Sequence, residues 1–427
     1  MAVAQQVSHV LPLGSRVNER GRLEVGGCDL VELAREVGTP AYVVAEDDLR
    51  ARARAFRAAF AAHADDVDIH FAAKAFPCTA VLALFAQEGL ACDVAGGGEL
   101  AAALRAGFDP GRIHVHGNAK SEEDLREALA AGVGHIVLDN AGEIDRLERL
   151  LAAGAGQPVQ MRIAPGVSPD THPAISTGGP NTKFGFNLAE APGAIARVGA
   201  SDRFALEGLH IHIGSQIFDL APFRPALRAL AGLGDFAVVN LGGGLGVAYR
   251  EDDRPPSVEA YAAEKVRLVR ELLERDGRVP RILDEPGRAL VANGCVTLYT
   301  VQSVKRNVAT WVGVDGGMAD NLRPMLYGAR YEAMLADRPG REGDPVQVTG
   351  RHCESGDVIV REARLPDPRI GDVVVTPATG AYGFAMANNY NGSRRPPVVF
   401  VKDGDARVVV RRETYDDLFA RDIADGR

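Results

Sequence analysis

The chain has 427 residues, of which 46% are hydrophobic and 25% are charged, as in an ordinary globular protein. This length predicts two domains rather than a single core. The net charge of −9 and the lack of a basic block exclude nucleic acid as a main partner, and no run of about 18 apolar residues predicts a membrane span.

Short β-rich runs alternate with amphipathic helical runs between Ala45 and about Leu290. The predicted strands are Asp68–Ala73, Ala91–Val94, Ile113–His116, His135–Leu138, Val159–Ile163, Leu206–Ile213, Phe236–Leu241 and Arg281–Asp284. The predicted helices include Asp47–Ala62, Glu99–Ala106, Glu122–Ala130, Glu143–Ala152 and Val258–Arg275. This repetition predicts a closed α/β barrel of the (β/α)8, TIM-like type over residues 45–290. An open doubly wound sheet is the alternative, but FAAKAF follows the first strand where such a sheet would carry GxGxxG.

The two ends of the chain predict a second domain. Runs such as CVTLYTVQSVK and DVVVTPA alternate in strand fashion, and long helical patterns are sparse after Cys295. We therefore expect an all-β C-terminal domain over residues 291–427. The N-terminal segment, residues 1–44, contains the strand-like Leu23–Val25 and is expected to complete that domain.

Unusual polar residues recur where the predicted barrel strands end. They are Lys74, Asp93, His116, Arg162, His210, His212, Gly242–Gly244 and Glu285–Arg288. Because barrel active sites gather at the carboxyl ends of the strands, this shared placement predicts one site.

Lys74 and the glycine run each suggest a cofactor contact. In the apolar FAAKAF, a neutral Lys74 would be a nucleophile able to form a Schiff base with an aldehyde cofactor, although a lysine snorkelling from a strand end remains open. The glycines of NLGGGLG can surround a phosphate or simply form a tight turn. Phosphate is favoured, because GGG follows strand seven and EPGR follows strand eight.

Glu285 and the HIHIGSQ histidines have two interpretations each. Glu285 can face a pyridine nitrogen and keep it protonated, or form a surface turn with an arginine. His210 and His212 share one face of the predicted strand. A metal site there lacks further ligands, so core packing of His210 and stacking of His212 on a flat cofactor are favoured.

Two loops contain candidate functional groups. HCESGD (His352–Asp357) carries a thiol that could deliver a proton, or is an ordinary polar turn around a buried cysteine. STGGPNTKFGFN, between strands five and six, is either a lid that closes over substrate or a static surface loop.

The cysteines and the N-terminus predict a cytoplasmic protein. The thiols are scattered, odd in number and without CxxC spacing, which fits a reducing compartment and no zinc site: Cys28, Cys78, Cys92, Cys295 and Cys353. The first twenty residues lack a signal-peptide core.

Read together, the motifs resemble the diaminopimelate decarboxylase family, which shares its barrel with ornithine and arginine decarboxylases and alanine racemase. They are GTPAYVV, FAAKAF, CDVAGGGEL, HGNAKS, STGGPNTKFGF, GLHIHIGSQ, GGGLG, EPGR, RPMLYGA, CESGD, TGAYG and NYNGSRRPPVVFV, in the family's order. The resemblance covers nearly the whole chain.

The resemblance implies pyridoxal 5'-phosphate as cofactor and a homodimer with shared active sites. Lys74 would carry the cofactor and Cys353 of the partner subunit would act in catalysis. The implied cofactor contacts are Lys74, Asp93, His212, Ser215, Gly242, Gly243, Gly244, Glu285, Gly287, Arg288 and Tyr382. The implied substrate contacts are Arg288, Arg323, Tyr327, Glu354 and Tyr382, and no metal is implied.

The implied reaction is decarboxylation of meso-diaminopimelate to L-lysine. The end of this substrate that does not react is a zwitterion. Arg323 and Tyr327 suit its carboxylate and Glu354 its ammonium group.

The sequence departs from the family's pattern at two positions. Phe76 and Ala119 stand where asparagine is usual. The alternatives are a decarboxylase of a related amino acid in a specialised pathway, a racemase, and a non-catalytic binding protein descended from a decarboxylase.

Overall fold

The computed structural model describes residues 7–167, 178–179 and 182–423. The chain divides into two compact units. The barrel unit comprises Arg52–Gly246 and Arg254–Ala289, and the β unit comprises Met1–Ala51, Val247–Asp253 and Leu290–Arg427. Val247–Asp253 therefore groups with the β unit, although the sequence places it within the predicted barrel.

The barrel unit contains a closed ring of parallel strands. In ring order they are β5 (Val67–Ala72), β6 (Ala91–Val94), β7 (Ile113–Val115), β8 (His135–Leu138), β9 (Gln157–Ala164), β11 (Phe204–His210), β12 (Val238–Asn240) and β13 (Arg281–Asp284). β8 pairs with β9 and β13 pairs with β5, so the ring has no open edge. A short strand, β10 (Phe186–Asn187), pairs with the end of β9. The predicted (β/α)8 barrel is confirmed.

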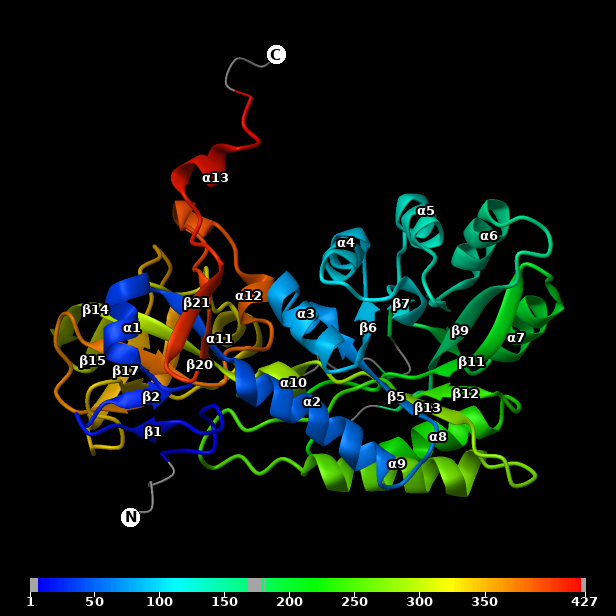
Figure 1. The fold of residues 1–427 in the computed structure, drawn as a ribbon, viewed down its shortest axis with the longest axis horizontal. Helices are drawn as coiled ribbons and strands as arrows, with labels where there is room; N and C mark the ends of the chain where they lie inside the picture. The colour runs from blue at the N-terminus through cyan, green and yellow to red at the C-terminus, as the bar shows by residue number, and fades with distance from the viewer. Residues whose placement is uncertain (1–6, 168–177, 180–181, 424–427) are drawn as a thin grey trace. The chain divides into compact units, whose positions relative to one another are not determined.

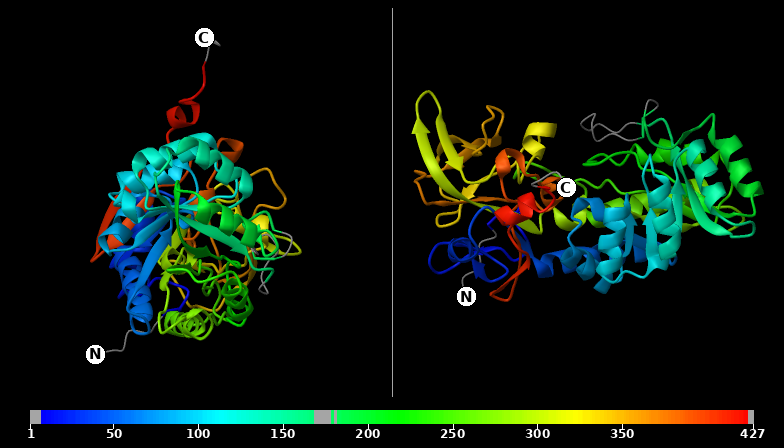
Figure 2. Two further views of the ribbon diagram at one scale, coloured as in Figure 1. Left: turned by 90° about the vertical axis from the view of Figure 1, so that its right-hand side faces the viewer. Right: turned by 90° about the horizontal axis from the view of Figure 1, so that it is seen from above.

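Helices lie outside these strands, coloured from blue (α3) through cyan and green to yellow-green (α9) in Figure 1 and arranged around the strands in the left view of Figure 2. They are α3 (Thr79–Gln87), α4 (Gly97–Arg105), α5 (Glu122–Ala131), α6 (Ala141–Leu150), α7 (Ala191–Ala200), α8 (Phe223–Ala231) and α9 (Val258–Leu273), with short 3-10 turns η1 (Ala73–Ala75) and η2 (Pro110–Arg112). α2 (Glu46–Ala61) runs across the division between the units. Each of these helices packs against its neighbours through an apolar stripe. Tyr261 of α9, for instance, meets the rings of Phe56, Phe60 and Phe223 edge to face.

Four predicted strands end earlier than expected, β5, β7 and β12 by one residue each and β11 by three. β5 stops at Ala72, so Lys74 lies in η1 and its side chain is exposed instead of ending a strand in apolar surroundings. β11 stops at His210. One further hydrogen bond joins it to β12, from the Ile211 amide to the carbonyl of Asn240. β12 ends there as well, so His212 follows the strand and does not share its regular alternation.

The β unit is built around strands from both ends of the chain. β4 (Ala41–Ala45) pairs antiparallel with β14 (Cys295–Arg306) and parallel with β20 (Val398–Lys402). The other strands are β15 (Thr310–Val314), β16 (Met334–Leu335), β17 (Asp344–Thr349), β18 (Val358–Leu365), β19 (Val373–Thr376) and β21 (Asp405–Val410), and β1 (Arg16–Val17), β2 (Leu23–Val25) and β3 (Cys28–Asp29) form a small separate sheet. The long β14–β15 hairpin is yellow in the right view of Figure 2.

A shared apolar core explains why the N-terminal segment belongs to this unit. Leu23, Val43, Val296 and Val399 all lie in one buried cluster. The unit's helices are short: α1 (Leu30–Val37), α10 (Arg288–Val291, which begins in the barrel unit), α11 (Arg323–Tyr327), α12 (Gly383–Met386), α13 (Tyr415–Phe419) and the turn η4 (Tyr390–Gly392). The predicted all-β domain, completed by the N-terminal segment, is confirmed.

Candidate active site

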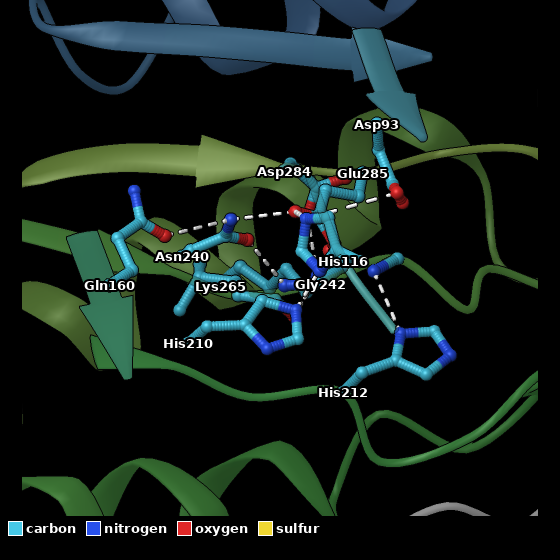
Figure 3. A network of polar contacts seen from close by, with 12 residues as sticks. Asp93, His116, Gln160, His210, His212, Asn240, Gly242, Lys265, Asp284 and Glu285 are labelled. Atoms are coloured by element: carbon cyan, nitrogen blue, oxygen red, sulfur yellow. Dashed lines mark hydrogen bonds and ion pairs between the residues drawn. The ribbon is translucent and has the colours of Figure 1, made fainter. Parts of the chain in front are cut away.

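The polar residues at the carboxyl ends of the barrel strands converge on one carboxylate, Glu285, directly after β13 (Figure 3). Asn240, the last residue of β12, donates from Nδ2 to Glu285 Oε1 over 2.6 Å. His116 Nε2 lies 3.0 Å from the same oxygen, and His210 Nε2 lies 3.1 Å from Oε2. Glu285 is buried, so these groups replace its hydration.

This network keeps Glu285 negatively charged. Burial alone would raise the pKa of Glu285, but the charge and hydrogen bonds of His116 and His210 hold that pKa well below its usual value. Burial alone would lower the pKa of His116, whereas Asp93 and Glu285 raise it. Burial lowers the pKa of His210 to about 4. The result is a buried carboxylate that can bind a protonated ring nitrogen.

The glycine loop after β12 is too closely packed for any side chain. A Cβ on Gly243 would lie 2.1 Å from the Glu285 carbonyl oxygen, and one on Gly244 would lie 2.5 Å from the Gly214 carbonyl oxygen. Gly242 and Gly244 also have φ values of +56° and +114°. The loop therefore has no side chain between its backbone and a ligand, so a phosphate can approach closely, although the Gly242 and Gly243 amides themselves donate to Asn240 Oδ1 and His212 Nδ1.

Ser215 and Arg288 add side-chain donors in the same unit. Arg288 opens α10, directly after Gly287, and its Nη2 and Nε lie 2.8 and 3.2 Å from Ser215 Oγ. A Cβ on Gly287 would come within 3.1 Å of the methyl groups of Ala72 and Ala75, so this turn packs against η1. A hydroxyl and a guanidinium together suit a phosphate dianion.

Lys74 and His212 are the remaining predicted site residues of the barrel unit. The charge of Lys74 acts to lower the pKa of both Asp93 and His212. The Lys74 ammonium therefore lies near two of the predicted cofactor contacts, although Lys74 is exposed. His212 Nδ1 accepts a hydrogen bond of 3.2 Å from the Gly243 amide. Burial, followed by the nearby Lys74 charge, lowers the pKa of His212 well below its usual value, so its imidazole is neutral.

The remaining predicted residues lie in the β unit. Arg323 and Tyr327 are the two ends of α11, and Arg323 is buried with its guanidinium 4.9 Å from the centre of the Tyr249 ring. Tyr382 precedes α12 in a left-handed conformation, with φ of +66°.

The HCESGD loop is held by side chains around it. His352 bridges Asp357 Oδ2 at 2.7 Å and Ser393 Oγ at 3.0 Å. Cys353 and Glu354 are exposed, and Glu354 Oε1 accepts from the Tyr390 hydroxyl at 2.6 Å. The alternative of a buried cysteine in this turn is therefore wrong.

Sequence reasoning missed Asn240 as a site residue. Asn240 connects the glycine loop to Glu285, because its Oδ1 accepts from the Gly242 amide at 3.0 Å while its Nδ2 donates to the carboxylate. The available signal was an asparagine at the end of an apolar strand directly before GGG. His116 was noted at its strand end, but its contact with Glu285 was not foreseen.

A metal is the other possible occupant of this part of the barrel. Ligand atoms of His114, His116 and Glu285 lie within 4.8 Å of one another. Both oxygens of Glu285, however, already accept hydrogen bonds or ion pairs from Asn240, His116 and His210. Four residues of the predicted lid, Ser176, Thr177, Pro180 and Asn181, lie outside the described residues.

Comparison with known proteins identifies the family. The pyridoxal-dependent decarboxylase family matches residues 46–292 through its pyridoxal binding domain. The diaminopimelate decarboxylase of Actinosynnema pretiosum subsp. auranticum is 47% identical over 96% of this chain and 95% of its own length, and that of Bacillus subtilis is 45% identical over 96% and 97%. The chain belongs to the diaminopimelate decarboxylases.

Solved structures agree with this membership. The decarboxylase from M. jannaschii superposes with a TM-score of 0.88 at 32% identity, covering 96% of this chain and 98% of that one. The Helicobacter pylori enzyme complexed with L-lysine gives 0.84 at 30% identity, covering 91% and 98%. None of the helices in the described ranges has the length and apolar character that crossing a membrane requires.

This decarboxylase is a pyridoxal-phosphate enzyme, and the barrel residues fit that cofactor. Ser215 and Arg288 form a side-chain donor set for a phosphate, and the closely packed glycine loop lets the phosphate approach the backbone. The anionic Glu285 matches a protonated pyridine nitrogen, and the neutral His212 ring matches a flat aromatic neighbour.

Proposed function

We propose that this decarboxylase converts meso-2,6-diaminopimelate to L-lysine and carbon dioxide. The observation that carries the proposal is Arg323, a cation that is 5% exposed and that, among the described residues, donates to the Tyr331 hydroxyl rather than to a carboxylate. Its Nε also has no hydrogen-bond partner there. A buried charge without a counter-ion is costly, so Arg323 is suited to an anionic ligand, the distal carboxylate of the substrate.

The substrate's other distal group is a cation. Glu354 is exposed next to Cys353 and can bind that ammonium group, while Tyr327 donates alongside Arg323. Cys353 Sγ delivers the proton to the carbon that loses its carboxylate. Both loop residues act on the partner subunit's barrel, so the active unit is a homodimer, and exposure of Cys353 and Glu354 supports this.

In the barrel, each proposed residue has one task. Lys74 holds the cofactor covalently through Nζ and Glu285 holds the proton on its ring nitrogen. His212 covers one ring face, Asp93 acts on the cofactor through His116, and Tyr382 closes over the site. Phosphate is bound by Ser215, Gly242, Gly243, Gly244, Gly287 and Arg288. When bound, the cofactor supplies an electron sink for the pair released with carbon dioxide.

We further propose a cytoplasmic setting. All five cysteines are free thiols, and four of them are buried. A reducing compartment preserves such thiols.

A substrate panel with two matched variants tests the function. Purified protein with pyridoxal phosphate should decarboxylate meso-diaminopimelate far better than LL-diaminopimelate, ornithine, arginine or lysine. Arg323→Gln should lower kcat/KM for diaminopimelate at least about tenfold, the scale of one lost charged hydrogen bond. Arg330→Gln, which removes an exposed arginine paired with Glu362, should leave it unchanged. Preference for ornithine, or equal effects of both variants, would contradict the proposal.

A further inference from the structure

The glycine loop is supported by a buried lysine of α9. Lys265 and Asp284 are each 0% exposed. Lys265 Nζ contacts Asp284 Oδ1 and the Tyr261 hydroxyl, and it also donates to two backbone carbonyl oxygens, those of Leu241 at 3.3 Å and Gly242 at 3.1 Å. Both carbonyls belong to the loop that follows β12.

A buried ion pair of this kind is not an efficient source of stability. Desolvation of the two charges offsets most of their attraction, and apolar replacements of such pairs are often neutral or stabilising. The contacts with the two carbonyls therefore point to a role in fixing backbone conformation.

The two carbonyls determine where two amides point. In a trans peptide the C=O and N–H groups point in opposite directions. With the Leu241 carbonyl held by Lys265, the Gly242 amide points away from the lysine and donates to Asn240 Oδ1 at 3.0 Å. With the Gly242 carbonyl held, the Gly243 amide likewise donates to His212 Nδ1 at 3.2 Å (Figure 3).

Each amide then sets the chemistry of a side chain. Because Asn240 Oδ1 faces the Gly242 amide, Asn240 must present Nδ2 to Glu285, the donor that an anionic carboxylate needs. Because His212 Nδ1 accepts a hydrogen bond, the neutral His212 ring must carry its proton on Nε2.

We propose that Lys265 is a positioning residue that orients the two peptides of the glycine loop, and through them fixes the amide orientation of Asn240 and the tautomer of His212. It touches neither substrate nor cofactor. The inference rests on the proposed cofactor roles of Glu285 and His212, but it does not depend on which amino acid is decarboxylated.

A second buried lysine offers a matched control. Lys120 pairs with Glu143 Oε1 at 2.9 Å and donates to the carbonyls of Gly117 and Val137 at 2.7 and 2.8 Å. Both partners are buried. The pair thus has the same burial and the same kind of contacts as Lys265 and Asp284, without touching the glycine loop.

The test compares Lys265→Met/Asp284→Leu with Lys120→Met/Glu143→Leu in the cofactor-loaded enzyme. Each double variant removes both charges, so no unpaired buried charge remains. We expect the Lys265 variant to bind pyridoxal phosphate about tenfold more weakly. The pH titration of its cofactor absorbance should shift, and kcat should fall with KM nearly unchanged. The Lys120 variant should keep wild-type cofactor affinity and absorbance titration.

Equal cofactor affinity and titration in the Lys265 variant and wild type would overturn the proposal, as would equal changes in both double variants. A further measurement needs no Lys265 variant. In wild-type holoenzyme labelled with 15N-histidine, and with the His212 signals assigned by comparison with His212→Gln, His212 should be neutral and protonated on Nε2. Protonation on Nδ1 would equally overturn the proposal. These cofactor readouts use no substrate, so failure of the proposed reaction would leave them intact.

Discussion

Glu285 is the residue on which the chemistry of the barrel depends. Three donors surround its two oxygens, and none of the three could be assigned to it from its neighbours in the sequence. A carboxylate that is buried and still anionic is costly, and His116 and His210 offset that cost. The arrangement is suited to holding a proton on a ring nitrogen throughout the reaction.

Replacing Glu285 with glutamine should separate cofactor binding from catalysis. Glu285→Gln keeps the size and a hydrogen-bonding oxygen but removes the charge that stabilises a protonated ring. We expect kcat to fall by roughly a hundredfold or more, the scale of losing one preorganised electrostatic contact. Cofactor affinity should change much less. Near-normal kcat, measured by carbon dioxide release, would be incompatible with the assigned role.

At the scale of elements, the strands of the barrel were predictable and their polar contacts were not. Apolar runs of the right length located every strand of the ring within a few residues. A strand that is buried in a barrel has an apolar sequence, and this signal lies within the strand itself. The end of β11 depended on where β12 stops, and the partner of Asn240, Glu285, lies 45 residues later in the chain, directly after β13. Lys265 resembled any lysine of an amphipathic helix until its contacts with Leu241 and Gly242 were known.

The strands also bring three histidine rings side by side, each tilted against the next. The ring centres of His70 on β5 and His114 on β7 are 4.2 Å apart, and those of His114 and His135 on β8 are 4.3 Å apart. Burial lowers the pKa of His70 from 6.5 to about 4 and lowers that of His114 well below its usual value. The imidazoles of His70 and His114 are therefore neutral in the folded protein.

The lowered pKa values of His70 and His114 predict a loss of stability in weak acid. Below pH 6.5 the unfolded chain binds a proton at His70, whereas His70 in the folded barrel stays neutral until the pH falls to about 4. The stability contribution is complete above pH 6.5 and falls as the pH drops toward 4, by up to about 1.4 kcal/mol per pH unit for each such histidine. His70→Gln should weaken the pH dependence of urea unfolding between pH 7 and 5, whereas His63→Gln, at an exposed histidine, should not. Identical slopes in all three proteins would refute this explanation.

At the scale of the whole molecule, the two ends of the chain form one unit through the pairing of β4 with β14 and β20. The sequence predicted that the N-terminal segment joins the β domain, but it did not predict which strands pair. Pairing between strands more than 250 residues apart leaves no local signal in the sequence. The same unit carries Cys353, and the barrel unit carries Lys74. In the proposed homodimer, each site would combine Lys74 of one subunit with Cys353 of the other.

Mixing two inactive variants should reveal shared sites. Lys74→Ala and Cys353→Ala homodimers should each be nearly inactive. After subunit exchange, a heterodimer has one site with both lesions and one site with neither. Activity should therefore recover to about a quarter of wild type if exchange is random, since half the dimers have one intact site. Native mass spectrometry verifies that heterodimers are present, and no recovery in their presence would show that each subunit uses its own Cys353.

The most direct measurement of the central claim is the product formed from meso-diaminopimelate in D2O. The enzyme with pyridoxal phosphate should release one carbon dioxide for each L-lysine, and nuclear magnetic resonance should find a single deuterium at the carbon that lost its carboxylate. Deuterium appearing in unreacted or epimerised diaminopimelate, without release of carbon dioxide, would show a racemase instead and contradict the account.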